Sequence, residues 1–142
     1  MSVNSISEQR SRIMSRVRGK NTKLEQLVSK CIWKRGIRFR KNVLSLFGKP
    51  DIAIKKYKVV IFIDSCFWHG CQSHFKLPNK NPQYWNNKIK RNIDRDNEVT
   101  LYYQKINWTI IRIWEHDLKA NFELVIYHVC RQIHMAKHID HL

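Results

Sequence analysis

The sequence predicts a small mixed α/β domain, in which a few strands are flanked by helices. Two segments have the composition of strands: residues 58–64 contain five apolar side chains in succession, and residues 108–114 are rich in β-branched and aromatic residues. Around them, apolar residues recur at the spacing of amphipathic helices. A chain of 142 residues is long enough to form one domain with its own hydrophobic core.

The N-terminal part is expected to contain two helices. Residues 7–18 have the pattern of a short, basic, amphipathic helix. A second helix is predicted to begin at Thr22-Lys-Leu-Glu25, because this is the Ser/Thr-x-x-Glu pattern of a capping box. Gly36 is a good stop signal for that helix.

The rest of the chain is predicted to alternate between strands and helices. Strands are expected at residues 38–43, 51–54, 58–64 and 108–114, and helices at residues 83–106 and 118–137. The continuous apolar run of residues 58–64 is typical of a strand that is buried on both faces. The order α-β-β-β-α-β-α is that of a small mixed α/β domain.

The charge of the chain predicts an anionic partner. Lys and Arg number 27 against 11 Asp and Glu, a formal net charge of +16, and nucleic acid is the usual partner of such an excess. A merely soluble basic protein is the alternative, but the charge is concentrated: residues 1–41 hold twelve Lys or Arg and two acids. We therefore expect residues 1–20 to form a basic DNA-binding arm and residues 21–142 a single domain. The expected phosphate contacts are Arg10, Arg12, Arg16, Arg18 and Lys20.

The sequence has no apolar run of the ~20 residues that cross a membrane, and no signal-peptide core follows its polar start. We expect a cytosolic protein that does not act at a membrane. Four cysteines in a cytosolic chain of this size indicate metal ligands or core thiols rather than disulfides. Cys31 and Cys130 fall at helical core positions and are interpreted as buried thiols.

The segment from Asp64 to His74, Asp-Ser-Cys-Phe-Trp-His-Gly-Cys-Gln-Ser-His, is the most informative part of the chain. It places two thiols and two imidazoles within eleven positions, and these are the ligand types that a tetrahedral Zn²⁺ ion requires. The adjacent Phe67 and Trp68 have little polypeptide around them to form a core. We therefore expect them to stand outward as stacking surfaces.

Two aspartates are candidates for a Mg²⁺ site. Asp51 opens one predicted strand and Asp64 closes the next, so both carboxylates would emerge at the same end of the sheet if the strands form a hairpin. Phosphodiester hydrolysis uses a divalent ion, and Mg²⁺ prefers carboxylate oxygens. Both aspartates could instead be turn formers. A carboxylate at the end of so apolar a strand favours a functional site, since its burial without a cation costs free energy.

The pattern Pro50-Asp51 followed by Asp64 resembles the PD…(D/E)xK signature of the restriction-endonuclease-like nucleases. The position of the usual lysine is occupied by Cys66. A zinc-bound thiolate cannot take the role of that lysine. His69 has a side chain suited to the proton transfer that hydrolysis requires.

A closer resemblance is to the very-short-patch repair endonucleases, over residues 10–118. The motifs that carry it are Cys66-Phe-Trp-His-Gly-Cys71 with the preceding Asp64, Asn92-x-x-Arg95-Asp96, and Trp108…Arg112-Ile-Trp-Glu115, with Met14 and Thr22-x-x-Glu25 as further likenesses. The resemblance implies a restriction-endonuclease-like mixed sheet flanked by helices, with a structural zinc loop. It also implies Mg²⁺-dependent nicking of one DNA strand 5′ of the thymine at T:G mismatches, which arise by deamination of 5-methylcytosine.

The same resemblance implies roles for individual residues. Asp51 would be the principal Mg²⁺ ligand, and His69 would activate water or assist the leaving group. Glu25 would support the site, although it could cap its helix instead, or do both. The best-known member has histidine in place of Asp64, so the role of Asp64 is open, and Mg²⁺ binding is the preferred interpretation.

The zinc ligands implied by the resemblance are Cys66, Cys71, His74 and His116. Relatives commonly present a cysteine in place of His116, and an imidazole is an acceptable replacement in a structural Cys₂His₂ site. A surface histidine at a helix start is the alternative for His116.

The resemblance also implies that four apolar side chains enter DNA: Phe67, Trp68 and Trp85 as a wedge beside the mismatch, and Met14 in the minor groove. The alternative for Trp85 and for Met14 is a place in the protein core. The expected partner is double-stranded DNA with a T:G mismatch. The protein is expected to act as a monomer, and other repair proteins would act after it. Two rival functions are a restriction-type endonuclease or nickase for a matched site, and a catalytically silent zinc protein that binds DNA.

Overall fold

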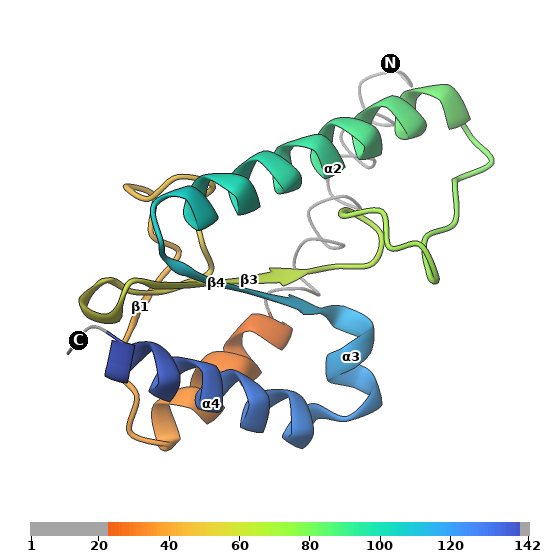
Figure 1. Cartoon of the computed structure of the whole chain (residues 1–142). Helices are drawn as coiled ribbons and strands as arrows, with labels where there is room; N and C mark the ends of the chain where they lie inside the picture. The colour runs from red at the N-terminus through yellow and green to blue at the C-terminus, as the bar shows by residue number, and fades with distance from the viewer. Residues whose placement is uncertain (1–22, 140–142) are drawn as a thin grey trace, which may run out of the picture.

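The computed structural model describes residues 23–139, which form a four-stranded mixed sheet between two layers of helices (Figure 1). The predicted helix over residues 7–18, Met14 and the five cations of the basic arm lie outside the described residues. No helix within residues 23–139 is long and apolar enough to cross a bilayer.

The strands lie in the order β1-β2-β3-β4. Their bounds are Arg40–Lys41, Ile52–Ile54, Val59–Asp64 and Thr109–Trp114. The pairs β1/β2 and β2/β3 are antiparallel, whereas β3 and β4 are parallel and are joined through helix α2 (Pro82–Lys105). The mixed α/β class is therefore as predicted, and β2 and β3 form the hairpin on which the expected placement of Asp51 and Asp64 depends.

Strand β3 is the centre of the core because both of its faces are covered. Its five apolar residues are at most 7% exposed. The side chains of Val59, Ile61 and Ile63 belong to one hydrophobic cluster, and those of Val60 and Phe62 belong to another. This alternation is that of a strand with two buried faces, as the apolar run predicts.

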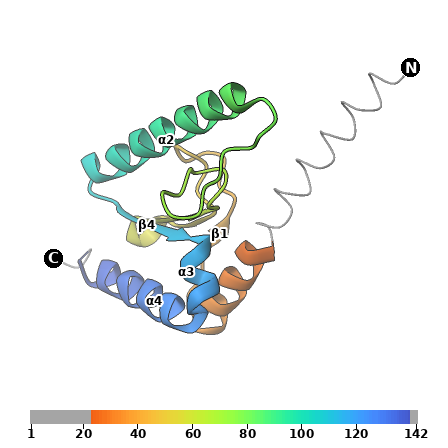
Figure 2. The ribbon, with the colours of Figure 1, turned by 90° about the vertical axis from the view of Figure 1, so that its right-hand side faces the viewer.

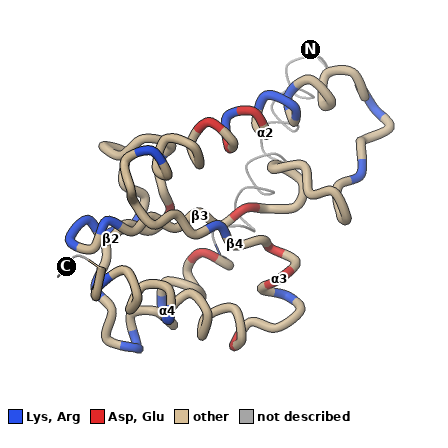
Figure 3. Tube along the Cα trace, in the orientation of Figure 1, with Lys and Arg blue, Asp and Glu red and all other residues tan. Residues whose placement is uncertain are grey.

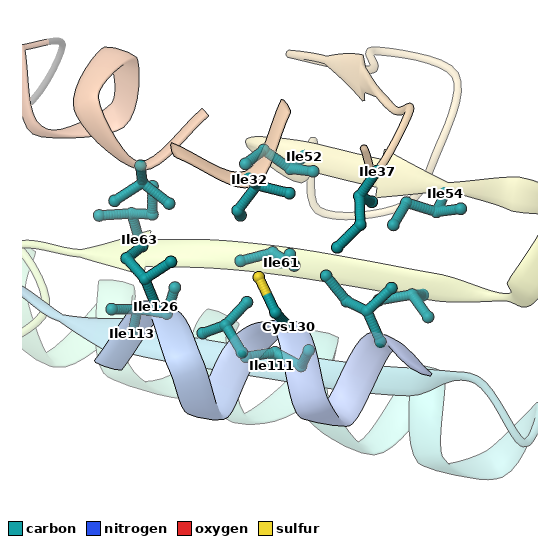
Figure 4. Close-up of a cluster of buried hydrophobic side chains, with 14 of the residues drawn as sticks. Ile32, Ile37, Ile52, Ile54, Ile61, Ile63, Ile111, Ile113, Ile126 and Cys130 are labelled. Atoms are coloured by element: carbon teal, nitrogen blue, oxygen red, sulfur yellow. The ribbon is translucent and has the colours of Figure 1, made fainter. Parts of the chain in front are cut away.

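The two helical layers are unequal. Helix α2 covers one face of the sheet, and α4 (Phe122–Ile139) covers the other together with a helix over residues 23–34 (Figures 1 and 2). The cluster beneath α4 is mainly isoleucine and includes Cys130, which is buried as predicted (Figure 4). Cys31, also predicted to be buried, is only partly buried and packs against the edge of this cluster.

The cluster beneath α2 is smaller and includes Val99 and Tyr103 of that helix. On the same side of the sheet, polar side chains of α2, among them Asn92 and Asp96, line a cleft.

Two predicted elements differ from the structure. The strand expected over residues 38–43 is only the two-residue β1, because the chain turns at Asn42, which has a left-handed backbone with φ of 50°. The helix expected over residues 118–137 is two helices, α3 (Glu115–Ala120) and α4. Asn121 separates them, because its backbone is not helical, with φ of −156° and ψ of 83°. Its side-chain oxygen accepts a hydrogen bond from the N–H of Leu124 at 3.2 Å, as at a helix N-cap.

Candidate active site and metal centre

The hairpin of β2 and β3 brings Asp51 and Asp64 to the same end of the sheet. Asp51 lies directly before β2, and its Oδ2 accepts a hydrogen bond from the N–H of Ile63 at 2.7 Å. Both carboxylates line one cleft, together with Glu25 and His69. The expectation that the two aspartates meet is therefore confirmed by strand pairing.

The acidic groups of the cleft lie in an environment that disfavours their charge. Burial raises the pKa of Asp51 and of Asp64. Burial, followed by the charge of Asp51 and a hydrogen bond to it, raises the pKa of Glu25 to about 7. Three carboxylates from separate elements thus crowd one cleft, which is favourable only if a proton or a cation is shared between them. This donor set fits a hard divalent ion such as Mg²⁺.

Asp64 is also held from the opposite side of the cleft. It is 3% exposed and receives two hydrogen bonds of 3.0 Å from Nη1 of Arg112, which lies on β4. Arg112 belongs to a motif that the sequence singles out, but no role follows for it from the sequence. The sequence feature that could have indicated a role is a charged residue in the middle of a strand rich in β-branched residues. A charged side chain buried there needs an oppositely charged or hydrogen-bonding partner.

His69 lies in the same cleft and is paired with Asp96 of α2. Its Nδ1 is 2.5 Å from Asp96 Oδ2 and 3.6 Å from Asp64 Oδ1. Burial lowers the pKa of His69, but the hydrogen bond to Asp96 and the charges of Asp64 and Asp96 outweigh it, so the pKa is raised overall. Asp96 thus holds the imidazole with Nδ1 toward its carboxylate.

The loop that carries His69 lies against α2, and a glycine allows that close approach. Gly70 has a left-handed backbone with φ of +60°, and a Cβ there would lie 2.7 Å from Cδ1 of Ile93 and 2.8 Å from Cγ2 of Ile89. Asn92, on the same helix, donates a hydrogen bond of 3.1 Å to the carbonyl of Trp68. The loop is thereby fastened to α2 on both sides of His69.

We expect Gly70→Ala to destabilise the protein and to displace His69. A left-handed backbone costs a non-glycine residue about 1–2 kcal/mol, and overpacking costs about 1–3 kcal/mol. The free energy of unfolding, measured in urea, should fall by the sum of the two costs. Gly36→Ala is the matched control, since Gly36 has φ of +86° but a Cβ there meets no atom within 4 Å. Equal costs for the two variants would show that the contact with α2 is unimportant.

The second site in this region is a cluster of four potential metal ligands. One ligand atom from each residue lies within 4.8 Å of the others, and the residues are the predicted Cys66, Cys71, His74 and His116. Nδ1 of His116 is 3.3 Å from the Sγ of Cys66 and 3.5 Å from the Sγ of Cys71. Tetrahedral zinc bonds of about 2.3 Å to sulfur and 2.0 Å to nitrogen place such atoms ~3.5 Å apart.

The surroundings of His116 also fit a metal ligand. It is the second residue of α3, directly after β4, so the parallel pairing of β3 with β4 carries it to the loop that follows β3. While Nδ1 faces the thiols, Nε2 is 3.3 Å from Oδ1 of Asp117. A carboxylate on the far ring nitrogen is the usual support of a zinc-bound histidine. His116 is thus both a helix-start residue and a member of the cluster.

An aromatic cluster borders the cleft. The ring of Phe67 lies 5.1 Å from that of Trp68 and 5.5 Å from that of Trp85, centroid to centroid. All three residues are half-buried, and none of them belongs to either hydrophobic core cluster. The rings therefore form one joint surface beside the cleft rather than separate outward side chains, and Trp85 belongs to this surface and not to the core.

Lys and Arg positions occur on the loop before α2 and along the N-terminal half of that helix, next to acidic positions farther along it (Figure 3). The cleft residues Lys49 and Arg95 are exposed cations. Carboxylates inside the cleft and cations at its rim are the arrangement expected where a polyanion is brought to a metal ion.

Comparison with known proteins identifies the family. The sequence model described as DNA mismatch endonuclease Vsr matches residues 5–74. A type II nicking enzyme of Neisseria meningitidis serogroup C, V.NmeDIP, is 44% identical over 116 residues, which are 80% of this chain and 78% of the relative. The chain belongs to the Vsr family. It is accordingly a DNA endonuclease, a hydrolase of phosphodiester bonds, as the Cys-Phe-Trp-His-Gly-Cys string predicts.

Further members of the Vsr family align over a similar part of the chain. The type II nicking enzyme V.NaeI of Lentzea aerocolonigenes is 40% identical over 76% of this chain and 68% of its own. The DNA mismatch endonuclease Vsr of Escherichia coli is 31% identical over 81% of this chain and 74% of its own. Family membership removes the rival function of a silent DNA-binding protein.

Proposed function

We propose that this Vsr-family endonuclease nicks duplex DNA at T:G mismatches, and that it cuts one strand 5′ of the thymine where 5-methylcytosine has been deaminated. The observation that supports this most is the aromatic surface beside the carboxylate cleft. Insertion of a ring between base pairs costs a few kcal/mol of unstacking, and the cost is least where pairing is already faulty. A surface of Phe67, Trp68 and Trp85 would therefore favour a mismatch over normal DNA.

The cleft residues would divide the chemistry between them. Asp51, with Asp64 on the side away from Arg112, would hold Mg²⁺, and Glu25 would support Asp51 through their hydrogen bond. The ion supplies charge stabilisation on the phosphate and lowers the pKa of a bound water. His69, oriented by Asp96, would transfer a proton to or from the attacking water or the leaving oxygen.

The cysteine and histidine cluster would hold a structural zinc ion. With four protein ligands the site is closed, which is typical of a structural rather than a catalytic zinc. Zinc would fasten the loop that carries His69 to the start of α3, and so keep the aromatic surface in place.

The remaining parts of the proposal concern binding. Residues 1–20 would act as a basic arm on the phosphate backbone, with Met14 in the minor groove, and residues 21–142 would form a single domain of restriction-endonuclease-like fold. A single nick requires one active site, so the protein would act as a monomer. The proposed place of action is bacterial DNA in the cytoplasm, ahead of downstream repair proteins.

A nickase for a matched site is the second candidate. It is favoured by the names of the relatives, since V.NmeDIP and V.NaeI, at 44% and 40% identity, are both type II nicking enzymes, whereas the relative named a mismatch endonuclease is 31% identical. The aromatic surface favours the mismatch reaction.

We expect the protein with Mg²⁺ to nick only the thymine-bearing strand of a duplex with one T:G pair. The test compares labelled duplexes that differ only by T:G, C:G or T:A at that position, in several flanking sequences. Cleavage of C:G or T:A duplexes at the same rate would support the matched-site nickase. Absence of cleavage from every duplex would contradict both candidates.

A further inference from the structure

The guanidinium group of Arg112 connects three elements beside the candidate active site. From β4 it donates through Nη1 to both carboxylate oxygens of Asp64 on β3, at 3.0 Å each. Nε donates to Oγ1 of Thr100 at 2.8 Å and Nη2 to the carbonyl of Asp96 at 3.0 Å, both on α2. The central carbon of the guanidinium group, Cζ, lies 4.8 Å from the centroid of the Phe62 ring. The planar group is thus fixed in direction as well as in place.

Both carboxylates that face His69 are contacted by this one arginine. Asp64 Oδ1 lies 3.6 Å from Nδ1 of His69, and Asp96 Oδ2 lies 2.5 Å from it. Asp64 is bound by Arg112 directly, whereas Asp96 is bound through its backbone carbonyl and has its Oδ1 4.0 Å from Nη2. A shift of the guanidinium group would therefore move both neighbours of the imidazole.

We propose that Arg112 is a positioning residue, which sets the orientation of His69 for the nicking reaction by holding Asp64 and Asp96 on either side of it. The inference rests on the role proposed above for His69. It assigns Arg112 no contact with the substrate.

The donors of Arg112 support a positioning role over a phosphate contact. A guanidinium group has five N–H donors on three nitrogens, and the contacts to Asp64, Thr100 and Asp96 engage all three nitrogens. The side chain is 20% exposed. Lys49 and Arg95 line the same cleft and are exposed, so they are better placed to meet phosphate.

Arg112→Lys tests the inference because it keeps the charge and removes the planar fork. We expect kcat to fall about 10- to 100-fold, as for other residues that orient a catalytic group. The KM for DNA, the dissociation constant and its salt dependence should be unchanged. If Arg112 contacted a phosphate, the variant would instead bind DNA more weakly, and the slope of log K against log salt concentration would fall by about one. That result would overturn the inference.

A double-mutant cycle with His69→Ala distinguishes positioning from general damage to the fold. If Arg112 acts through His69, Arg112→Lys with His69→Ala should be no slower than His69→Ala alone. If the loss of rate in the double variant equals the product of the losses in the two single variants, Arg112 acts independently of His69. If His69→Ala retains full activity, the role proposed for His69 fails. If it loses activity while Arg112→Lys does not, only the positioning role fails.

Two further variants control for stability. Thr100→Val removes the acceptor of Nε with little change of shape, and should lower kcat in the same direction while thermal unfolding still shows a folded protein. Arg131→Lys, at an exposed position on α4, should leave kcat and the melting temperature unchanged. All variants are assayed on whichever duplex the wild-type protein nicks, so failure of the T:G proposal leaves this test intact.

Discussion

Asp51→Asn is expected to lower the nicking rate by about a thousandfold, because several kcal/mol of charge stabilisation by a bound Mg²⁺ correspond to at least that factor. The amide keeps the size of the side chain and can still accept the hydrogen bond from Ile63, so the local backbone should be retained. Single-turnover nicking of labelled duplex at saturating protein measures the effect on the chemical step.

The stability of Asp51→Asn shows whether the variant loses activity because a Mg²⁺ ligand is missing or because the protein is no longer folded. Burial is the main reason that the pKa of Asp51 is raised, and the charge of Asp64 adds to it, so the charged form is unfavourable in the absence of a cation. The metal-free variant should therefore unfold at the same or a higher temperature than the wild type. Asp94→Asn, the same change at an exposed position of α2, is the matched control and should nick normally. Full activity of Asp51→Asn would remove Asp51 from the reaction.

Loss of the proposed zinc ion should have the largest effect on stability. We expect about one zinc ion per chain, and expect Cys71→Ser or strong chelation to lower the free energy of unfolding by about 4–5 kcal/mol, as loss of a structural metal does. The reason is that the Sγ of Cys71 is buried beside His74 and His116, so a bound ion would join the loop of Cys71 to α3, and its loss would leave these polar groups without that link. Zinc analysis and urea unfolding measure both quantities.

His116 offers a sharper control for the zinc site. Its replacement by alanine should release zinc, whereas its replacement by cysteine, another zinc ligand, should retain the metal and the fold. Cys31→Ser should keep zinc, because Cys31 packs against the core and lies outside the cluster. A folded, zinc-free and fully active protein would contradict the assignment of the ligands.

Much of the fold could be predicted from local patterns. The apolar run of β3 predicts a doubly buried strand, and the structure has one. The apolar spacing of residues 83–106 predicts α2 to within one residue at each end. Boundaries set by a single residue were predicted less well, since the left-handed Asn42 ends β1 and the non-helical Asn121 separates α3 from α4. Asparagine tolerates such conformations but does not by itself announce them.

The family and the candidate metal ligands could be identified from short motifs, because residue types and their spacing are visible without a fold. The sequence placed Asp51 and Asp64 at the same end of the sheet only on the condition that their strands form a hairpin, and the structure meets that condition. The groups that surround the two aspartates follow from the tertiary structure. His69 pairs with Asp96, 27 positions away, and Asp64 pairs with Arg112, 48 positions away. These pairs depend on α2 crossing the sheet and on β4 pairing parallel to β3, and no local pattern encodes the register of two elements so distant in the chain.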